Sequence, residues 1–305
     1  MYVKGILYMK ATLYLIFATI FLGLNFHLAK IILQEVNFIE AGFWRFLFGV
    51  GALVLLGFKT LPDLKLIIKN IKGISLTGFI GLFGFNTFFF LGLMNTTAVN
   101  AALIVSLNPA LTILFSHKIL KTSVTKIQLL GILIAFLGVA YVILKGETSN
   151  LSNLQFNYGD ILILIANVFF ALHHVWTKKY AANISSSSFT LLTSLCCLIG
   201  FLILSPFNGI EKITTHPPVF WESVFGIGCL GTALAYFLWQ KGVLVIGADK
   251  AGIFMNIVPL STAVLAVFFN KNLHEYHLIG GLFIILGMLI TRKKVFNSKL
   301  HKSLS

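Results

Sequence analysis

The sequence predicts an all-α integral membrane protein with ten transmembrane helices, arranged as two inverted five-helix repeats. Three observations carry this prediction: the composition, the length of the apolar runs, and a similarity between the two halves of the chain. Of the 305 residues, 58% are hydrophobic and only 10% are charged, whereas soluble domains carry about 25% charged residues. The apolar runs are continuous rather than alternating, which favours helices over a membrane barrel.

Each predicted span is an apolar run that is bounded by polar residues and close to the ~20 residues that cross the hydrocarbon core. We place the ten spans at 11–33, 40–58, 73–93, 98–117, 126–144, 159–179, 188–205, 219–242, 247–268 and 276–292. The first run lacks a small-residue cleavage site, so we interpret it as a span and not as a signal peptide. Because Met9 directly precedes this run, the true start is either Met1 or Met9.

The distribution of Lys and Arg predicts the orientation of these spans. With the N-terminus inside, eighteen basic residues fall in cytoplasmic segments, three fall outside, and two lie within helices. Basic residues concentrate on the cytoplasmic side of membrane proteins. We therefore expect a multi-pass protein of the cell (inner or plasma) membrane with both termini in the cytoplasm. The net charge of +14 then reflects topology and not a nucleic-acid partner; the lipid bilayer is the expected partner, and a monomer the expected state.

The two halves match when Gly78 is aligned with Gly228. This alignment brings six identical pairs together: Gly78/Gly228, Gly81/Gly231, Gly92/Gly242, Ala98/Ala248, Ala101/Ala251 and Pro109/Pro259. The spans at 40–58 and 188–205 show no convincing match. Because each half has an odd number of spans, the second half is inverted in the membrane. A duplicated membrane unit is typical of transporters, which hold the substrate where the halves meet.

This repeat divides the chain into five predicted segments. They are a cytoplasmic tail over 1–10, a first repeat over 11–144, an external linker over 145–158, a second repeat over 159–292, and a basic cytoplasmic tail over 293–305.

The sequence offers no catalytic residues and no metal site. It lacks a Ser–His–Asp set and an HExxH motif, and the adjacent His173 and His174 are not spaced to bind one metal ion. The three Cys residues fall inside apolar runs, where we expect small buried hydrophobes. We therefore predict that the protein is not an enzyme and has no cofactor, with an intramembrane enzyme as a remote alternative.

Polar and aromatic side chains within the spans are the candidates for a substrate cavity, because polar groups in lipid are costly. Asn86 and Tyr236 occupy equivalent positions of the two halves, as do Phe89 and Trp239, and these pairs are the strongest candidates. For each candidate, packing between helices is the alternative. The complete set is Asn25, His27, Asn86, Phe89, Asn108, His173, Tyr236, Trp239, Gln240 and Asn256.

Three basic residues within the spans are interpreted as structural or gating groups. Lys30 and Lys178 lie near helix ends, where their amines can equally well reach the lipid headgroups. Arg45 is expected to tie helices together. Pro109 and Pro259 each remove one backbone hydrogen bond inside a span, so we expect a helix kink at each.

Four stretches of the sequence resemble the EamA-type transporters of the drug/metabolite transporter superfamily. They are GLNFHLAK at 23–30 with 40–45, the Asn108-Pro109 pair, the Gly159-Asp160 pair, and 231–259 with 278–287. The chain departs from the family pattern at Leu22, where Trp is usual, and at Lys118 and Lys271, where Glu is usual. The resemblance implies a ten-helix basket with a central cavity that moves amino acids, amines, nucleotide derivatives or other small metabolites.

We therefore predict a secondary transporter or exporter of small metabolites that works by alternating access between the inverted repeats. The basic and amide residues of the spans favour a small-molecule substrate with a carboxylate, such as an amino acid. The alternative is uptake or exchange of a nucleoside-like metabolite such as S-adenosylmethionine, which aromatic side chains would suit through stacking and cation–π contact.

Overall fold

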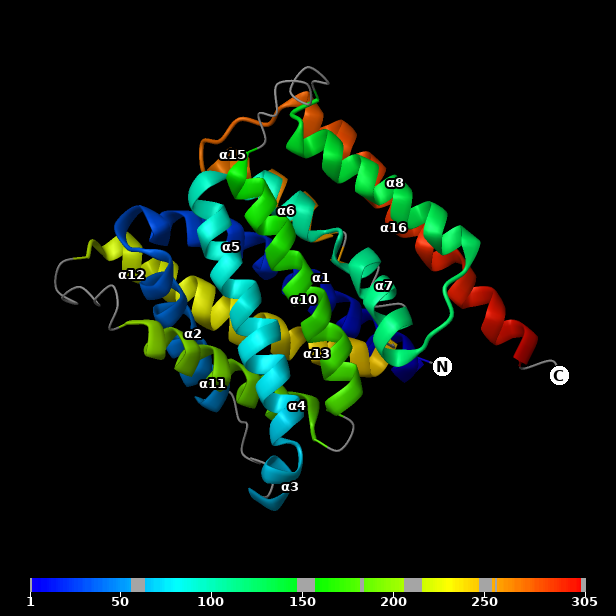
Figure 1. Ribbon diagram of the computed structural model, residues 1–305, viewed down its shortest axis with the longest axis horizontal. Helices are drawn as coiled ribbons and strands as arrows, with labels where there is room; N and C mark the ends of the chain where they lie inside the picture. The colour runs from blue at the N-terminus through cyan, green and yellow to red at the C-terminus, as the bar shows by residue number, and fades with distance from the viewer. Residues whose placement is uncertain are drawn as a thin grey trace.

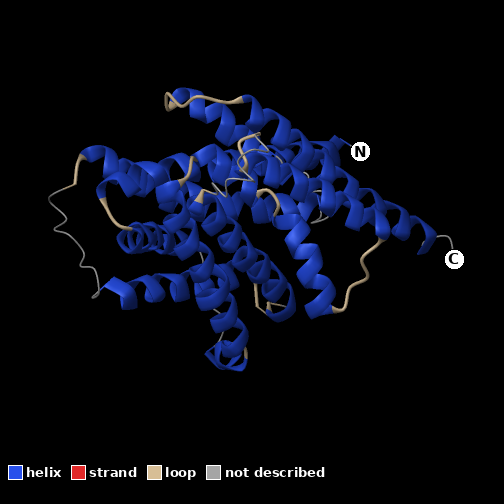
Figure 2. Ribbon diagram, turned by 45° about the horizontal axis from the view of Figure 1, so that its top comes forward, coloured by secondary structure: helices blue, strands red, loops and turns tan. Residues whose placement is uncertain are grey.

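A computed structural model describes residues 2–55, 64–146, 157–181, 184–205, 216–246, 254–255 and 257–302 of the chain. Over these residues the protein is helical and contains no strand (Figure 2). Eight of the described helices are long and apolar enough to cross a membrane, and shorter apolar helices lie at Ile257–Phe268 and Glu275–Ile290. The prediction of an all-helical, multi-pass membrane protein is confirmed.

The helices follow one another in the same order in both halves. The first half contains α1 (Tyr2–Glu35), α2 (Phe38–Leu55), α3 (Leu64–Lys69), α4 (Ile71–Ser75), the π-helical η1 (Leu76–Phe83), α5 (Gly84–Asn95), α6 (Ala98–Val105), α7 (Asn108–Leu120) and α8 (Lys126–Ile143). The second contains α10 (Tyr158–Tyr180), α11 (Ser186–Leu204), α12 (Pro218–Phe225), the π-helical η4 (Gly226–Leu234), α13 (Ala235–Ile246), α15 (Ile257–Phe268) and α16 (Glu275–Lys302).

The first two helices of each half pack mainly against helices of the other half. Helix α1 packs against η4, α13 and α15, whereas α10 packs against η1, α5, α6 and α7. In the same reciprocal way, α2 packs on η4 and α11 packs on η1. The main hydrophobic core accordingly contains residues from both halves. The contact between the halves is therefore the interior of the protein and not a surface between two separate bodies.

Close contacts at glycines show that the equivalent helices α8 and α16 run antiparallel. These helices lie side by side along one flank of the molecule (Figure 1). A β-carbon on Gly138 would lie 2.7 Å from the carbonyl oxygen of Gly280, and one on Gly287 would lie 2.5 Å from that of Gly131. The sequence repeat pairs Gly131 with Gly280 and Gly138 with Gly287. A local two-fold axis that superposes α8 on α16 therefore also superposes the Gly138–Gly280 contact on the Gly287–Gly131 contact.

We expect replacement of Gly138 with leucine to separate α8 from α16. The new side chain would meet a backbone carbonyl, which cannot rotate away, and overpacking of this kind costs about 1–3 kcal/mol. The midpoint of thermal unfolding of the purified protein should fall. Gly51 of α2 supplies the matched control, because a β-carbon there meets no atom of the described residues within 4 Å. An equal fall of the unfolding midpoint in G138L and G51L would contradict this interpretation of the contact between α8 and α16.

The span predicted at 98–117 is interrupted in the structure. Helix α6 ends at Val105 and α7 begins at Asn108, with Ser106 and Leu107 in a turn between them. Pro109 therefore lies in the first turn of α7, where its missing N–H would have no helical partner anyway. Pro259 likewise lies in the first turn of α15. Just before Pro109 the α-helical hydrogen-bond pattern is interrupted at Ser106 and Leu107, which keep right-handed helical dihedrals, and Ala98–Leu120 remains one candidate span.

The π-helical segments η1 and η4 are features that the sequence did not predict. They are equivalent, because the repeat aligns Gly78 and Gly81 of η1 with Gly228 and Gly231 of η4. A π-helical stretch interrupts the regular hydrogen-bond ladder and occurs frequently at functional sites. In η4 the Thr232 hydroxyl donates to the carbonyl oxygen of Ile227 at 2.9 Å, so a side chain substitutes for part of the backbone ladder.

Candidate functional site

The strongest candidate site surrounds Arg45, which α2 places among residues of both halves. Arg45 is only 4% exposed, and its Nε donates a hydrogen bond to Oγ1 of Thr232 at 3.3 Å. Its guanidinium carbon lies 5.7, 6.0 and 5.9 Å from the ring centroids of Phe46, Phe89 and Phe90. Within the described part of the chain, no carboxylate lies within 4 Å of it. The site is thus a cation with aromatic walls and no counter-ion.

The position of Arg45 along α2 makes the burial of its charge in the membrane energetically unfavourable. It is the eighth of the 18 residues of the helix, so at 1.5 Å per residue it lies at least ~10 Å from either end. A charge at such depth costs at least ~2.5–3.5 kcal/mol on insertion scales, and charges kept there usually line a substrate pathway. The sequence suggested a helix tie at Arg45, whereas its surroundings favour a ligand-binding group.

Two of the predicted cavity residues, Phe89 and Tyr236, lie near Arg45, and a third, Asn86, shares a helical face with Phe89. The Phe89 ring is one of the aromatic rings around the guanidinium. The phenol of Tyr236 is close enough to interact electrostatically with the charge of Arg45. Asn86 lies one turn before Phe89 on the same face of α5. Its Nδ2 donates to the carbonyl oxygen of Leu82 at 2.8 Å, and its buried Oδ1 has no partner among the described residues. This oxygen is an acceptor available to a ligand.

Of the three aromatic and amide candidates that remain in the second half, the structure places only the side chain of Trp239, and it lies away from Arg45. Trp239 packs against a small apolar cluster that contains Ala11 and Leu15, in the seam between α1 and α13. The side chain of Gln240 and the whole of Asn256 lie outside the described residues. Tyr236 and Trp239 therefore have different surroundings, although they share one helical face.

Asn25 and His173 occupy equivalent positions of the two repeats, and both fasten a first helix to a π-helical segment. Asn25 Nδ2 donates to the carbonyl oxygen of Gly231 in η4 at 2.9 Å. His173 Nδ1 donates to the carbonyl oxygen of Thr77, next to the start of η1, at 3.2 Å. Asn25 Oδ1 has no partner among the described residues. Both side chains are occupied in joining the two halves.

His27 and Asn108 also join helices. His27 Nε2 donates to the carbonyl oxygen of Thr262 at 2.8 Å, which links α1 to α15. Asn108 Nδ2 donates to Oδ1 of Asn167 at 2.9 Å, and Asn167 Nδ2 in turn donates to the carbonyl oxygen of Ile104 at 2.9 Å. Asn167 was absent from the predicted candidates, although an amide inside an apolar span is the signal that marks it.

A second group, also missed, surrounds Asp160 at the start of α10. Asp160 is fully buried and accepts hydrogen bonds from Thr96 Oγ1 and from Asn100 Nδ2, the latter at 3.2 Å. His277 Nε2 lies 3.0 Å from Asn100 Oδ1, and His277 Nδ1 accepts the backbone N–H of His274 at 2.9 Å. The group joins α10, α6 and α16. The sequence indicated only an acid at a helix start.

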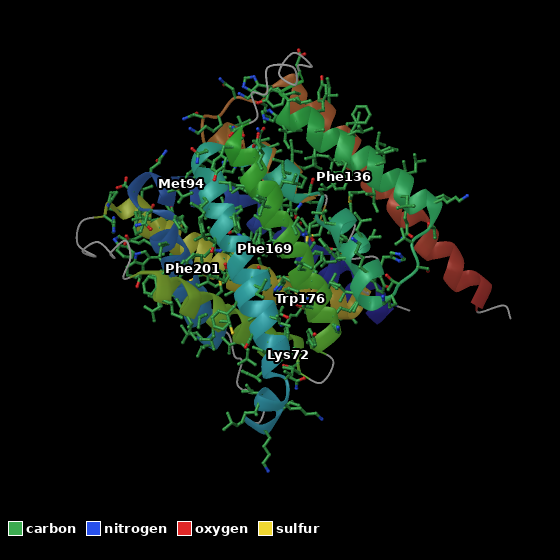
Figure 3. The ribbon with its side chains drawn as sticks, viewed as in Figure 1. Lys72, Met94, Phe136, Phe169, Trp176 and Phe201 are labelled. Carbon is green, nitrogen blue, oxygen red and sulfur yellow. The ribbon has the colours of Figure 1, made fainter. Side chains whose placement is uncertain are left out.

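The remaining basic candidates lie at helix ends. Lys30 lines a cavity of about 300 Å³ together with Leu33, Gln34, Met94 and Lys271. Met94 lies at one end of the rod formed by α4, η1 and α5, and Lys72 lies at the other end (Figure 3). Lys178 is exposed near the C-terminal end of α10.

The described residues provide no obvious place for a metal ion. Among them, no three His, Cys, Asp or Glu side chains lie close enough together to coordinate one. Cys196, Cys197 and Cys229 are free thiols within apolar helices.

Comparisons with known proteins place the chain among membrane transporters. The model of the EamA-like transporter family matches it twice, over residues 9–144 and 157–292. The uncharacterized transporter YyaM of Bacillus subtilis (strain 168) is 32% identical over 92% of this chain and 94% of its own length. The uncharacterized transporter YetK of the same organism is 28% identical over 88% of this chain and 82% of its own. A solved crystal structure shares the fold, with a TM-score of 0.64 over 93% of this chain and 98% of its own, at 18% identity.

Proposed function

The chain belongs to the EamA-like transporter family, and from this premise we propose that it is a secondary transporter of amino acids or related carboxylate-bearing metabolites. The observation that carries the proposal is the buried guanidinium of Arg45, which has aromatic walls and no carboxylate within 4 Å among the described residues. A guanidinium binds a carboxylate through two parallel hydrogen bonds. A substrate carboxylate would supply the counter-ion that no described residue provides within 4 Å.

The groups around Arg45 have separate tasks in this proposal. Thr232 accepts the hydrogen bond from Nε, which orients the guanidinium and leaves its terminal amino groups for the substrate. The rings of Phe46, Phe89 and Phe90 exclude water, so the ion pair forms in a low-dielectric environment where it is strong. The unpaired Oδ1 of Asn86 is an acceptor for a substrate ammonium group.

In alternating access between inverted repeats, the site at Arg45 would open first to one side of the membrane and then to the other. The repeat, the reciprocal packing of α1 and α10, and the antiparallel pair α8 and α16 support ten membrane crossings related by a two-fold axis in the membrane plane. Arg45 and Thr232 lie on opposite sides of the contact between the halves. Rocking of the halves would therefore expose the bound carboxylate to one face and then to the other. The interruption at 106–107 and the π-helical segments are the points where the helices would bend.

The orientation follows from the distribution of charge. Both termini lie at the same side of the molecule (Figures 1 and 2), as an even number of crossings requires. The bias of Lys and Arg toward one side supports a cytoplasmic location for this side. We propose a monomer in the cell membrane with both termini inside.

The alternative substrate, S-adenosylmethionine, suits the site less well. It carries a carboxylate, but also a sulfonium cation and an ammonium group. Arg45 would repel the two cations in the same buried space, where no described carboxylate lies within 4 Å of the guanidinium to offset them. Amino acids with neutral or acidic side chains are therefore favoured.

A flux assay in proteoliposomes tests the proposal. Each radiolabelled amino acid with a single carboxyl group is paired with the amine that remains when this group is lost, for example leucine with isopentylamine and phenylalanine with phenethylamine. We expect at least one amino acid to move and its paired amine not to compete. Transport of amines at equal rates, or no flux of any amino acid, would refute a carboxylate transporter.

A further inference from the structure

Two lysines line one cavity at the end of the bundle that carries Met94. The cavity measures about 300 Å³ and lies between the end of α1, the end of α5 and the segment after α15 (Figure 3 labels Met94). Its basic residues are Lys30 and Lys271, and its remaining lining comes from Leu33, Gln34 and Met94.

These two amines have little to neutralise them. Lys30 Nζ donates one long hydrogen bond, of 3.4 Å, to the carbonyl oxygen of Met94. Within the described part of the chain, neither amine has a carboxylate within 4 Å. A concave site lined by charges of one sign, with apolar walls, concentrates counter-ions and raises their association rate. The positive charge of Lys30 and Lys271 therefore favours the binding of an anion in the cavity.

We propose that the Lys30–Lys271 cavity is an anion-capture site, which collects the carboxylate-bearing substrate at the outer face before it reaches Arg45. This inference rests on the proposed function for the identity of the substrate, but the binding of an anion to the cavity does not. The cavity volume is at the lower end of the range for small-molecule sites. Leu33 and Met94 supply apolar surface, and Gln34 supplies a neutral polar group for the rest of the ligand.

The internal repeat gives this cavity a counterpart. The sequence repeat pairs Lys30 with Lys178 at an offset of 148, and the offset of 150 that aligns Gly78 with Gly228 brings Lys271 onto Lys121. Helix α10 packs on α7 as α1 packs on α15, so the second pair belongs to the opposite mouth. Lys121 and Lys178 are both exposed there. A lysine pair at each mouth suits a carrier that accepts its anion from either side of the membrane.

Chemical labelling tests capture without any transport. The full-length protein in detergent is treated with an amine-acetylating reagent, and acetylation of each lysine is measured by mass spectrometry. We expect sodium glutamate to reduce labelling of Lys30 and Lys271 at least threefold, relative to the isosteric neutral glutamine at equal ionic strength. The exposed Lys126 at the start of α8 is the internal control and should be unaffected.

A lipid phosphate has the same chemistry as a soluble anion, so a second arm separates the two sources. The labelling is repeated with phosphatidylglycerol in the micelle and no glutamate. Protection by glutamate supports substrate capture. Protection by the lipid alone would assign the two lysines to headgroup binding and overturn the proposal, as would the absence of protection in both arms.

Transport kinetics test the role of the cavity. In proteoliposomes, the K30Q/K271Q double variant should raise the KM for external glutamate about tenfold, in line with the size of electrostatic steering, and leave kcat unchanged. The KM for glutamine should stay the same, and K118Q/K126Q should behave as wild type. An unchanged KM for glutamate would overturn capture. If the wild-type protein moves no amino acid, the proposed function fails, whereas the labelling result still decides whether the cavity binds anions.

Discussion

Replacement of Arg45 with methionine is expected to abolish carboxylate transport while leaving the substrate-free protein at least as stable as the wild type. The loss in kcat/KM should be at least ~30-fold, because truncation of one partner of a buried charge pair costs about 2–5 kcal/mol, and 1.36 kcal/mol is tenfold. Stability should hold because methionine removes a buried cation that has no carboxylate within 4 Å among the described residues, and apolar replacements of buried charges are often neutral or stabilising. Flux assays and thermal unfolding measure the two effects.

The combination of results distinguishes a ligand-binding Arg45 from a structural one. A helix tie would lose stability in R45M, whereas a ligand-binding group would lose only the stabilisation that added substrate gives. R45K supplies a graded control, since lysine keeps the charge but not the two-pronged geometry. T232V removes the acceptor for Nε and should weaken transport less than R45M does. A lowered unfolding midpoint in R45M with unaffected flux would return Arg45 to a structural role.

Replacement of Asp160 with asparagine is expected to lower the midpoint of thermal unfolding by about 2–5 °C. The reason is the fixed direction of the hydrogen bonds. His277 Nδ1 accepts from the backbone of His274, so Nε2 must carry the proton and donate to Asn100 Oδ1. Asn100 can then offer only its amino group to residue 160. An asparagine there must present its Oδ1 to that donor, which leaves its Nδ2 facing the Thr96 hydroxyl that now donates to the carboxylate. The charge-assisted hydrogen bonds of the carboxylate are then lost, and hydrogen bonds to charged groups are worth about 1.5–3 kcal/mol against about 0.5–1.5 kcal/mol for neutral pairs.

An acid-to-amide change without this constraint is the control for Asp160. Glu222 of α12 is exposed, so E222Q should leave the unfolding midpoint unchanged. Substrate flux in D160N, measured well below its unfolding temperature, should remain, because Asp160 lies in a group that fastens helices. A normal unfolding midpoint in D160N would show that the group does not depend on the charge-assisted hydrogen bonds of the carboxylate.

The sequence was sufficient to predict the helical fold, because the length and polarity of each apolar run reflect the thickness of the bilayer. It was insufficient for α2 and α11, which show no convincing match in sequence. The structure aligns them through their first turns, where Asn37 and Ser185 both cap the helix start. Gly78 lies against Cys196, and the equivalent Gly228 lies against Phe48. The shared property is the geometry of packing, which different apolar side chains satisfy equally.

The candidate site was predictable only in part for a different reason. Sequence periodicity identifies polar groups inside apolar helices, but not the backbone groups that are free to pair with them. Those depend on where a hydrogen-bond ladder is interrupted. Asn167 binds the Ile104 carbonyl oxygen next to the interruption in the fourth span, and Arg45 binds Thr232 inside a π-helical segment. Neither interruption can be deduced from hydrophobicity.

The exchange of first helices between the halves has a consequence for biosynthesis. The hydrogen-bond partner of Asn25 is Gly231, which is 206 residues further along the chain. At about 5–20 residues per second, α1 must remain in the bilayer for ~10–40 s with this amide unmatched. Arg45 lacks its partner Thr232 for almost as long, because the two are 187 residues apart. Insertion intermediates of this protein therefore expose polar groups to lipid until translation is nearly complete, and a truncated first half alone would be a natural substrate for membrane quality-control proteases.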